Sequence, residues 1–173
     1  MNNLNRVFYD HVRKNDIRAV RRVIYLGANP NYRQALHYAV EKGYYKLAVA
    51  LLKRGADPDE ISSRGDNVIT SYLRILCNKK SRDKTVWPNN LLLEELVKRT
   101  SDMNLENKYG CTAMIYCARL VGVLNLSIME SMVRKSPSHS CRTEVRKSDM
   151  FRGYRLMGLA LMTLASPIAA SFI

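Results

Sequence analysis

The residues of this chain best suited to chemistry are its cysteines and histidines, and their spacing decides whether they can form a site. The four cysteines are Cys77, Cys111, Cys117 and Cys141. The three histidines are His11, His37 and His139. No two cysteines have the C-x-x-C spacing of a metal or redox site, and only His139 lies close to a cysteine in the sequence. We therefore expect no metal site.

The sequence also lacks the patterns that place catalytic groups. It contains no G-x-S-x-G, no H-E-x-x-H and no phosphate-binding glycine loop. No helical spacing brings two carboxylates into one pocket. We expect a non-enzymatic protein with no catalytic residue, no cofactor and no small-molecule substrate.

Charge is the strongest compositional feature of the chain. Its 173 residues include 28 Lys and Arg against 15 Asp and Glu, a formal net charge of +13. Such an excess favours acidic proteins, nucleic acid or anionic membranes as partners. The basic residues are spread from Arg6 to Arg155, which is more typical of solvated helix faces than of one nucleic-acid groove. Nucleic-acid binding is therefore kept as the alternative to binding an acidic protein.

The beginning of the chain bears on its compartment. Residues 1–9 (MNNLNRVFY) do not continue into the apolar run of a secretory signal. We expect the cysteines to be reduced thiols in the cytoplasm, with the nucleus as the alternative.

The stretch 35–59 (ALHYAVEKGYYKLAVALLKRGADPD) has the clearest structural pattern. Apolar residues recur at spacings of three and four in both of its halves, which predicts two short helices with one apolar face each. Gly43 separates the halves and Gly55 ends the second, because glycine adopts positive φ without steric cost. The pattern predicts a helix, a turn, a second helix and a loop.

The same stretch resembles the ankyrin repeat. Leu36-His37, Ala39, Gly43, Leu51-Leu52 and Gly55-Ala56-Asp57 stand at the offsets of the family's T-P-L-H, A, G, L-L and G-A-D. The resemblance implies an all-α solenoid of stacked helix pairs with short or absent β-hairpins. It also implies that His37 is a structural residue whose ring ties neighbouring loops by hydrogen bonds.

Weaker copies of this pattern divide the chain into units. We predict four ankyrin-like repeats within residues 1–135, at about 5–31, 32–59, 60–104 and 105–135. In the first unit Asn15 takes the place of Gly43, and Val7, Phe8 and Val12 are expected to face inward. A deletion between Asn31 and Gln34 shortens the loop before the second unit, where Gln34 and Ala35 also replace the family's Thr-Pro.

Two stretches depart from the repeat pattern. Residues 78–90 (NKKSRDKTVWPNN) are an insertion that we expect to be an exposed loop, in which Trp87 either covers the helix pair or grips a partner. Residues 136–152 are expected to be a polar, basic linker. Residues 153–173 are a partial fifth repeat or an apolar tail, and because 156–173 carries no charge, a membrane anchor is an alternative.

The resemblance further implies that loop tips and first helices form a concave, partner-binding groove. The matching positions are Arg13, Lys14, Tyr32, Arg33, Glu41, Lys42, Ser63, Arg64, Asp66, Arg74, Lys108, Tyr109, Cys111 and Arg119. Lys and Arg dominate this set, so we expect an acidic protein partner and salt-sensitive association. The irregular repeats are similar to ankyrin proteins of poxviruses and of intracellular bacteria, which implies a pathogen factor acting on host proteins.

Overall fold

The computed structural model describes residues 3–82, 88–120 and 123–135. Its helices are α1 (Asn3–Arg13), α2 (Ile17–Tyr25), the 3-10 helix η1 (Tyr32–Gln34), α3 (Ala35–Glu41), α4 (Tyr45–Lys53), α5 (Val68–Arg82), α6 (Asn90–Arg99), α7 (Ala113–Arg119) and α8 (Leu126–Lys135). These ranges contain no β-strand. The prediction of an all-helical fold is therefore confirmed.

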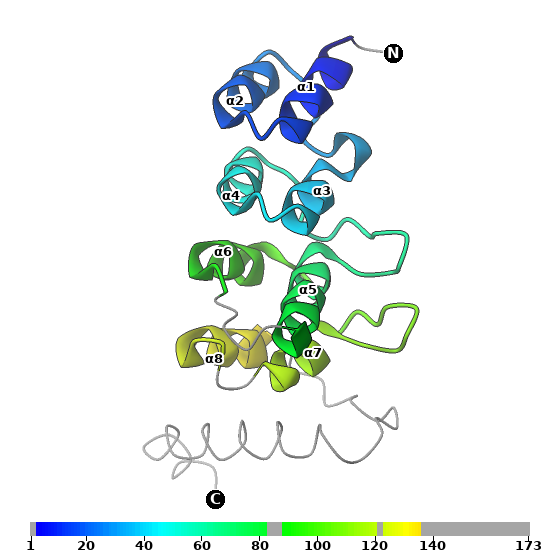
Figure 1. Ribbon diagram of the computed structural model, residues 1–173, viewed down its shortest axis with the longest axis vertical. Helices are drawn as coiled ribbons and strands as arrows, with labels where there is room; N and C mark the ends of the chain where they lie inside the picture. Colours follow the sequence, from blue (N-terminus) through cyan, green and yellow to red (C-terminus); the bar gives the residue numbers. More distant parts are fainter. Residues whose placement is uncertain (1–2, 83–87, 121–122, 136–173) are drawn as a thin grey trace, which may run out of the picture.

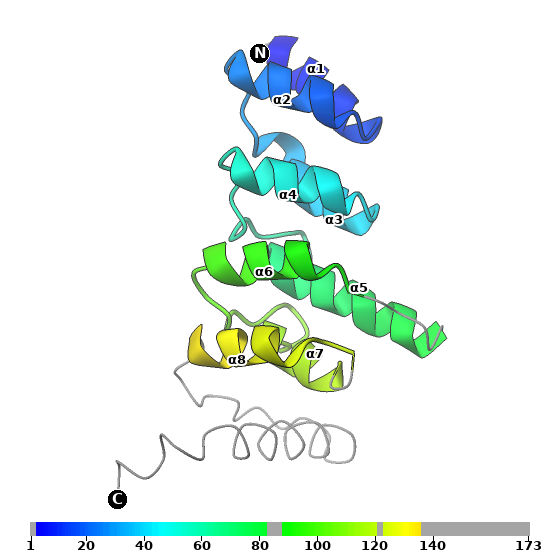
Figure 2. The same cartoon turned by 90° about the vertical axis from the view of Figure 1, so that its left-hand side faces the viewer.

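The helices stand in two columns (Figure 1). The first column contains α1, α3, α5 and α7, and the second, which faces the viewer in Figure 2, contains α2, α4, α6 and α8. Within each column a helix contacts the next one in order, and each helix also contacts its partner in the other column. Each pair thus buries its apolar faces against its neighbours, which is how a solenoid is stabilised.

Side-chain caps begin several of these helices. Asp16 Oδ1 accepts a hydrogen bond from Ala19 N at 3.0 Å, and Thr112 Oγ1 accepts one from Ile115 N at 3.3 Å. Helix α3 has no such cap, because Gln34 precedes it with φ 52° and makes no capping bond. Gln34 instead donates from Nε2 to the carbonyl oxygen of Ile61 at 2.9 Å.

The core runs continuously through all four helix pairs. Its largest fully buried side chains include Phe8, Leu36, Leu51, Leu73 and Leu96. The expectation that Val7 faces inward was wrong, since its side chain is 38% exposed. Helix α1 is terminal, and Phe8 and Val12, one turn apart, already fill its contact face.

Helix α5 is longer than the sequence indicated. The stretch expected to be a loop from residue 78 is helical as far as Arg82. Lys and Arg are good helix formers, and the first proline beyond them is Pro88, so a basic run alone does not end a helix. Trp87 lies outside the described residues.

The loops at the ends of the second-column helices are joined in series. Asn31 Oδ1 accepts from Asp57 N at 2.8 Å, and both carboxylate oxygens of Asp59 lie 3.0 Å from Ser101 N. Next along, Lys135 Nζ donates to the carbonyl oxygens of Lys98 and Thr100. None of the described helices is long and apolar enough to cross a membrane, and the 136–152 and 153–173 segments lie outside the described residues.

Candidate protein-interaction surface

Two loops project from the first column of helices (Figure 1). We call them finger A (residues 54–67) and finger B (residues 100–112). Each is closed by one side-chain oxygen that accepts two backbone N–H groups. In finger A this is Ser62 Oγ, which accepts from Arg64 and Asp66; in finger B it is Asn107 Oδ1, which accepts from Tyr109 and Cys111. The fingers are therefore built on the same plan and present their tips in the same way.

The two fingers touch through their backbones. Lys108 N donates to the carbonyl oxygen of Arg64 at 3.1 Å. Gly65 makes this approach possible: it has φ +80°, and a Cβ atom there would lie 3.1 Å from Lys108 N and 3.3 Å from Asn107 Cα. Because both neighbours are backbone atoms, they cannot rotate away as a side chain could.

We expect Gly65→Ala to lower the free energy of unfolding by about 2 kcal/mol, from positive-φ strain and the clash with finger B together. Gly55→Ala is the matched control, since Gly55 has φ +88° with no atom within 4 Å of its Cβ position. Gly55→Ala should lower the free energy of unfolding only through the strain of positive φ, by about 1 kcal/mol. Urea unfolding of both variants measures the difference, and equal losses would show that finger contact does not require a glycine.

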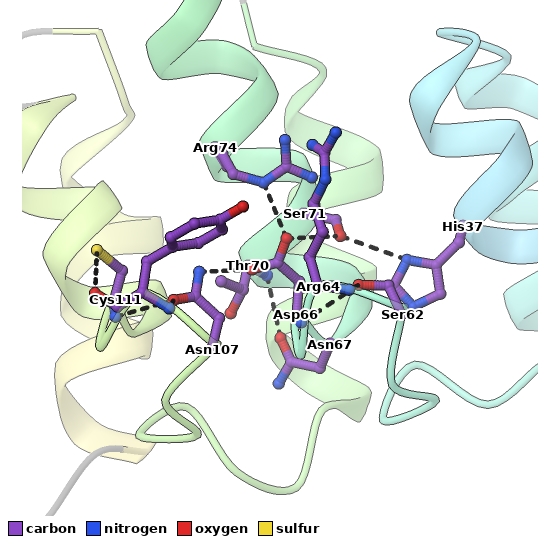
Figure 3. Close-up of polar contacts among 11 residues, drawn as sticks. His37, Ser62, Arg64, Asp66, Asn67, Thr70, Ser71, Arg74, Asn107 and Cys111 are labelled. Carbon is purple, nitrogen blue, oxygen red and sulfur yellow. Dashed lines mark hydrogen bonds and ion pairs between the residues drawn. The ribbon is translucent and has the colours of Figure 1, made fainter.

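A buried polar network links the fingers to the helices (Figure 3). Asp66 is 1% exposed; its Oδ2 accepts from Arg74 Nε at 2.8 Å and its Oδ1 from Asn107 Nδ2 at 2.7 Å. Ser71 Oγ lies 3.5 Å from Asp66 Oδ2 and 3.4 Å from His37 Nδ1. Three successive helix pairs thus share one network centred on a carboxylate.

His37 occupies one end of this network. Its Nε2 lies 2.7 Å from the carbonyl oxygen of Glu60, so Nε2 carries the proton and donates, which leaves Nδ1 as an acceptor 3.4 Å from the hydroxyl of Ser71. Burial lowers the pKa of His37, against the opposing effects of the Glu60 carbonyl and the nearby carboxylates of Glu41 and Asp66. His37 ties finger A to α3 by hydrogen bonds, as the family resemblance implied.

Most of the residues predicted to bind a partner are accessible. The exposed ones are Arg13, Lys14, Arg33, Glu41, Lys42, Ser63, Arg64, Lys108, Tyr109 and Arg119, and the half-buried ones are Tyr32, Arg74 and Cys111. Asp66 is not accessible, because Arg74 and Asn107 hold it in the interior. Arg74 is held by the same ion pair and is less available to a partner, since its side chain is only 11% exposed.

The structure brings three tyrosines together beside one arginine. The ring centroid of Tyr9 lies 6.3 Å from that of Tyr32 and 5.7 Å from that of Tyr38. The guanidinium carbon of Arg33 lies 5.7 Å from the Tyr9 centroid and 5.5 Å from the Tyr32 centroid. Lys42 Nζ lies 5.7 Å from the Tyr38 centroid. We call this group, Tyr9, Tyr32, Arg33, Tyr38 and Lys42, the tyrosine cluster.

Comparison with known families identifies one repeat of the scaffold. Residues 33–63 match the family model of the ankyrin repeat, a stretch that spans α3, α4 and most of finger A. The fold is an ankyrin-repeat solenoid. Ankyrin repeats generally act as scaffolds that bind other proteins, and the matched repeat supports a protein-interaction module. No curated protein matches the sequence.

Two members of the tyrosine cluster, Tyr9 and Tyr38, were not among the predicted site residues. A signal for Tyr9 was present in the ankyrin period: Gly27 and Gly55 are 28 residues apart, and subtracting 28 from 37 places Tyr9 at the position of His37. Tyr9 therefore takes the position from which the ankyrin histidine reaches the next loop. Nothing in the pattern indicated that its ring would meet Arg33.

Among the described cysteines of the ankyrin solenoid, Cys117 is unsuited to act as a reactive thiol. Cys117 is fully buried, and this burial raises the pKa of its thiol to about 12, so the thiol stays neutral. Residues 3–82, 88–120 and 123–135 contain no group of His, Cys, Asp and Glu able to hold a metal ion. Cys141 lies outside these ranges.

One hollow lies on the opposite side, between α6 and α8 of the second column. It has a volume of about 390 Å³ and is lined by Val97, Ile128 and the stems of Lys98 and Lys135, among others. It is separate from the fingers and the tyrosine cluster. The predicted partner-binding positions lie on the first column and its loops, so we place the candidate interaction surface there.

The buried His37 makes the ankyrin solenoid sensitive to mild acid. Its pKa is lower when folded than in the unfolded chain, where it is about 6.5. Above that pH both states are neutral and His37 has no effect. As the pH falls below it, the unfolded chain binds the proton first, so stability is lost.

We expect unfolding free energy to fall between about pH 7.5 and pH 6.0, and to fall less in His37→Gln, which cannot titrate. Chemical denaturation of both proteins at the two pH values measures this. The same loss in both would show that another group causes it.

Proposed function

We propose that this ankyrin solenoid binds an acidic segment of a protein partner across the face formed by α1, α3, α5, α7 and the two fingers. The observation that carries the proposal is the excess of cations at the predicted positions of that face, eight Lys or Arg against two carboxylates; it is not the charge of the fingers as a whole, which also contain Asp57, Asp59, Glu60, Asp102 and Glu106. Of its two predicted carboxylates, Asp66 is buried and paired, which leaves Glu41. Arg33 and Lys42 form no ion pair with any described residue. These cations remain available to a partner's carboxylates.

Aromatic and apolar groups on the same face would add affinity to this charge. Tyr109 at the tip of finger B is 68% exposed, and Ile61 of finger A is 45% exposed. Tyrosine and arginine are the residue types on which binding energy concentrates in protein interfaces. Complementary charge would mainly speed the encounter, so affinity should fall as salt screens it.

A capture experiment with the full chain as bait tests the proposal. Binding should weaken between about 50 mM and 300 mM salt and should survive nuclease treatment. A face variant, with Arg33, Lys42, Arg64 and Lys108 changed to Gln, should lose the bound protein. The matched control changes four exposed cations of the second column, Arg18, Arg21, Lys46 and Lys53, to Gln, and should retain it.

Each contrary outcome has a meaning. Loss of binding on nuclease treatment would replace the proposal with nucleic-acid binding. Equal loss in both variants would mean that net charge, and not this face, attracts the partner. A cytoplasmic location, a role as a pathogen factor and tethering through residues 156–173 stay predictions.

A further inference from the structure

The tyrosine cluster holds one cation in an unusual way. Arg33 is exposed, yet its guanidinium lies near two rings, about equally far from the centroids of Tyr9 and Tyr32. Two other arginines of the solenoid are held by carboxylates, Arg74 by Asp66 and Arg99 by Glu95, and the guanidinium carbon of Arg119 lies 5.8 Å from the centroid of one ring, that of Tyr116. Arg33 is oriented by aromatic faces instead and has no carboxylate among the described residues.

The backbone at this site is strained. Arg33 has φ 53° and ψ 38°, and Gln34 has φ 52° and ψ 43°, so two successive residues other than glycine are left-handed. Glycine would adopt this conformation at no steric cost, whereas a side chain there is disfavoured. The left-handed backbone at Gln34 is explained by its side chain, which donates a hydrogen bond to the carbonyl oxygen of Ile61. Strain at Arg33 is typical of a residue retained for what its side chain does.

The geometry leaves the binding groups of Arg33 free. The rings of Tyr9 and Tyr32 are nearly perpendicular, with an interplanar angle of 82°, so the planar guanidinium can turn its face to only one of them. The N–H groups that do not point at a ring remain available as donors. Two parallel N–H donors match the two oxygens of a carboxylate. Because the rings restrict the side chain, less rotamer entropy is lost when a ligand binds.

We propose that Arg33 is the anchor for a single Asp or Glu side chain in a linear segment of the protein partner. This deepens the proposed function and rests on it. The ring of Tyr38 lies 5.7 Å from that of Tyr9, and Ile61, whose carbonyl accepts from Gln34, has a 45% exposed side chain. These are the groups on neighbouring elements available to an apolar residue next to that carboxylate. The alternative ligand is a phosphorylated residue. Phosphate-binding sites usually contain several arginines, whereas the tyrosine cluster contains one.

Selection from a random linear peptide library displayed on phage, with the folded full chain as target, tests the proposal. The selected peptides should share an Asp or Glu beside an apolar residue. One of them is then synthesised in three forms, with Glu, Gln or phosphoserine at the shared acidic position. Affinities for the wild type and its variants are measured by fluorescence anisotropy.

Arg33→Gln should weaken the Glu peptide about tenfold, and Arg33→Lys should weaken it several-fold, since lysine lacks the planar pair of donors. Arg21→Gln removes the same charge from an exposed position on α2 and should change nothing. The Gln peptide should bind wild type and Arg33→Gln alike, because Arg33 then has no carboxylate to bind in either complex. Circular dichroism checks that each variant is folded.

Several results would overturn the proposal. They are selected peptides without a shared carboxylate, a phosphoserine peptide that binds while the Glu peptide does not, and a Glu peptide that is insensitive to Arg33→Gln. Failure to enrich any peptide whose binding depends on Arg33 would also overturn the proposal. If the four-site face variant still loses its captured protein while Arg33→Gln does not, this anchor is wrong and the proposed function stands.

Discussion

Asp66→Asn is expected to lower the free energy of unfolding by about 3 kcal/mol. Asp66 is 1% exposed and uses one oxygen for Arg74 Nε and the other for Asn107 Nδ2. Asparagine keeps the shape but replaces one oxygen with an NH₂ group, which then faces a donor. It also removes the charge that compensates Arg74, whose side chain is itself largely buried.

Urea denaturation monitored by circular dichroism measures this loss, and Glu95→Gln is its control. Glu95 makes the same kind of contact with Arg99, but on the surface of α6, so its loss should cost less than about 0.5 kcal/mol. The double variant Asp66→Asn with Arg74→Met should recover part of the loss, because no buried cation is then left alone. A cost for Asp66→Asn no larger than that of the control would mean that the network stabilises nothing.

Leu36→Ala is expected to cost about 3 kcal/mol, through lost apolar burial and the cavity that remains. Leu36 is fully buried in α3, and this helix contacts α1, α4 and α5, so the side chain lies where two helix pairs meet. The surrounding helices are held on several sides and can collapse only in part onto the vacated space.

Leu91→Ala is the matched control for Leu36→Ala, since Leu91 begins α6 and is 70% exposed. Its truncation should change stability by less than about 0.5 kcal/mol. If the two variants lost similar stability in urea, Leu36 would not be a core residue. A lower slope of the transition in Leu36→Ala would show that the stack no longer unfolds as one unit.

The sequence was sufficient for features that depend on local patterns. The two helices of residues 35–59 follow from their apolar spacing, and the left-handed turn at Asn15, with φ 56°, follows from its place opposite Gly43. The bonds of His37 were anticipated from the resemblance to the ankyrin motif. Each of these depends on residues within one turn or one repeat.

Features that depend on distant residues were missed. Asp66 was expected on the surface because the ankyrin resemblance placed it on the partner-binding face, but its burial depends on Asn107, 41 residues away, and no pattern connects the two. The extension of α5 was missed because exposed basic residues are equally common in loops and on helix surfaces. The tyrosine cluster joins residues of α1, η1 and α3, which are distant in the sequence. The left-handed backbone at Arg33 could not be predicted, because the residue there is not glycine.

The order of contacts along the stack predicts which helix pair opens to solvent most readily. The Asp66 network and the contact between fingers link α3, α5 and the two fingers. The first helix pair takes part in neither and is joined to the second by the packing of α1 on α3 and α2 on α4, by ring contacts and by loop bonds. Its amide hydrogens should therefore exchange with solvent soonest. A ligand lying on Tyr9 and Tyr38 at once would bridge α1 and α3, and would protect the amides of the first pair without touching most of them.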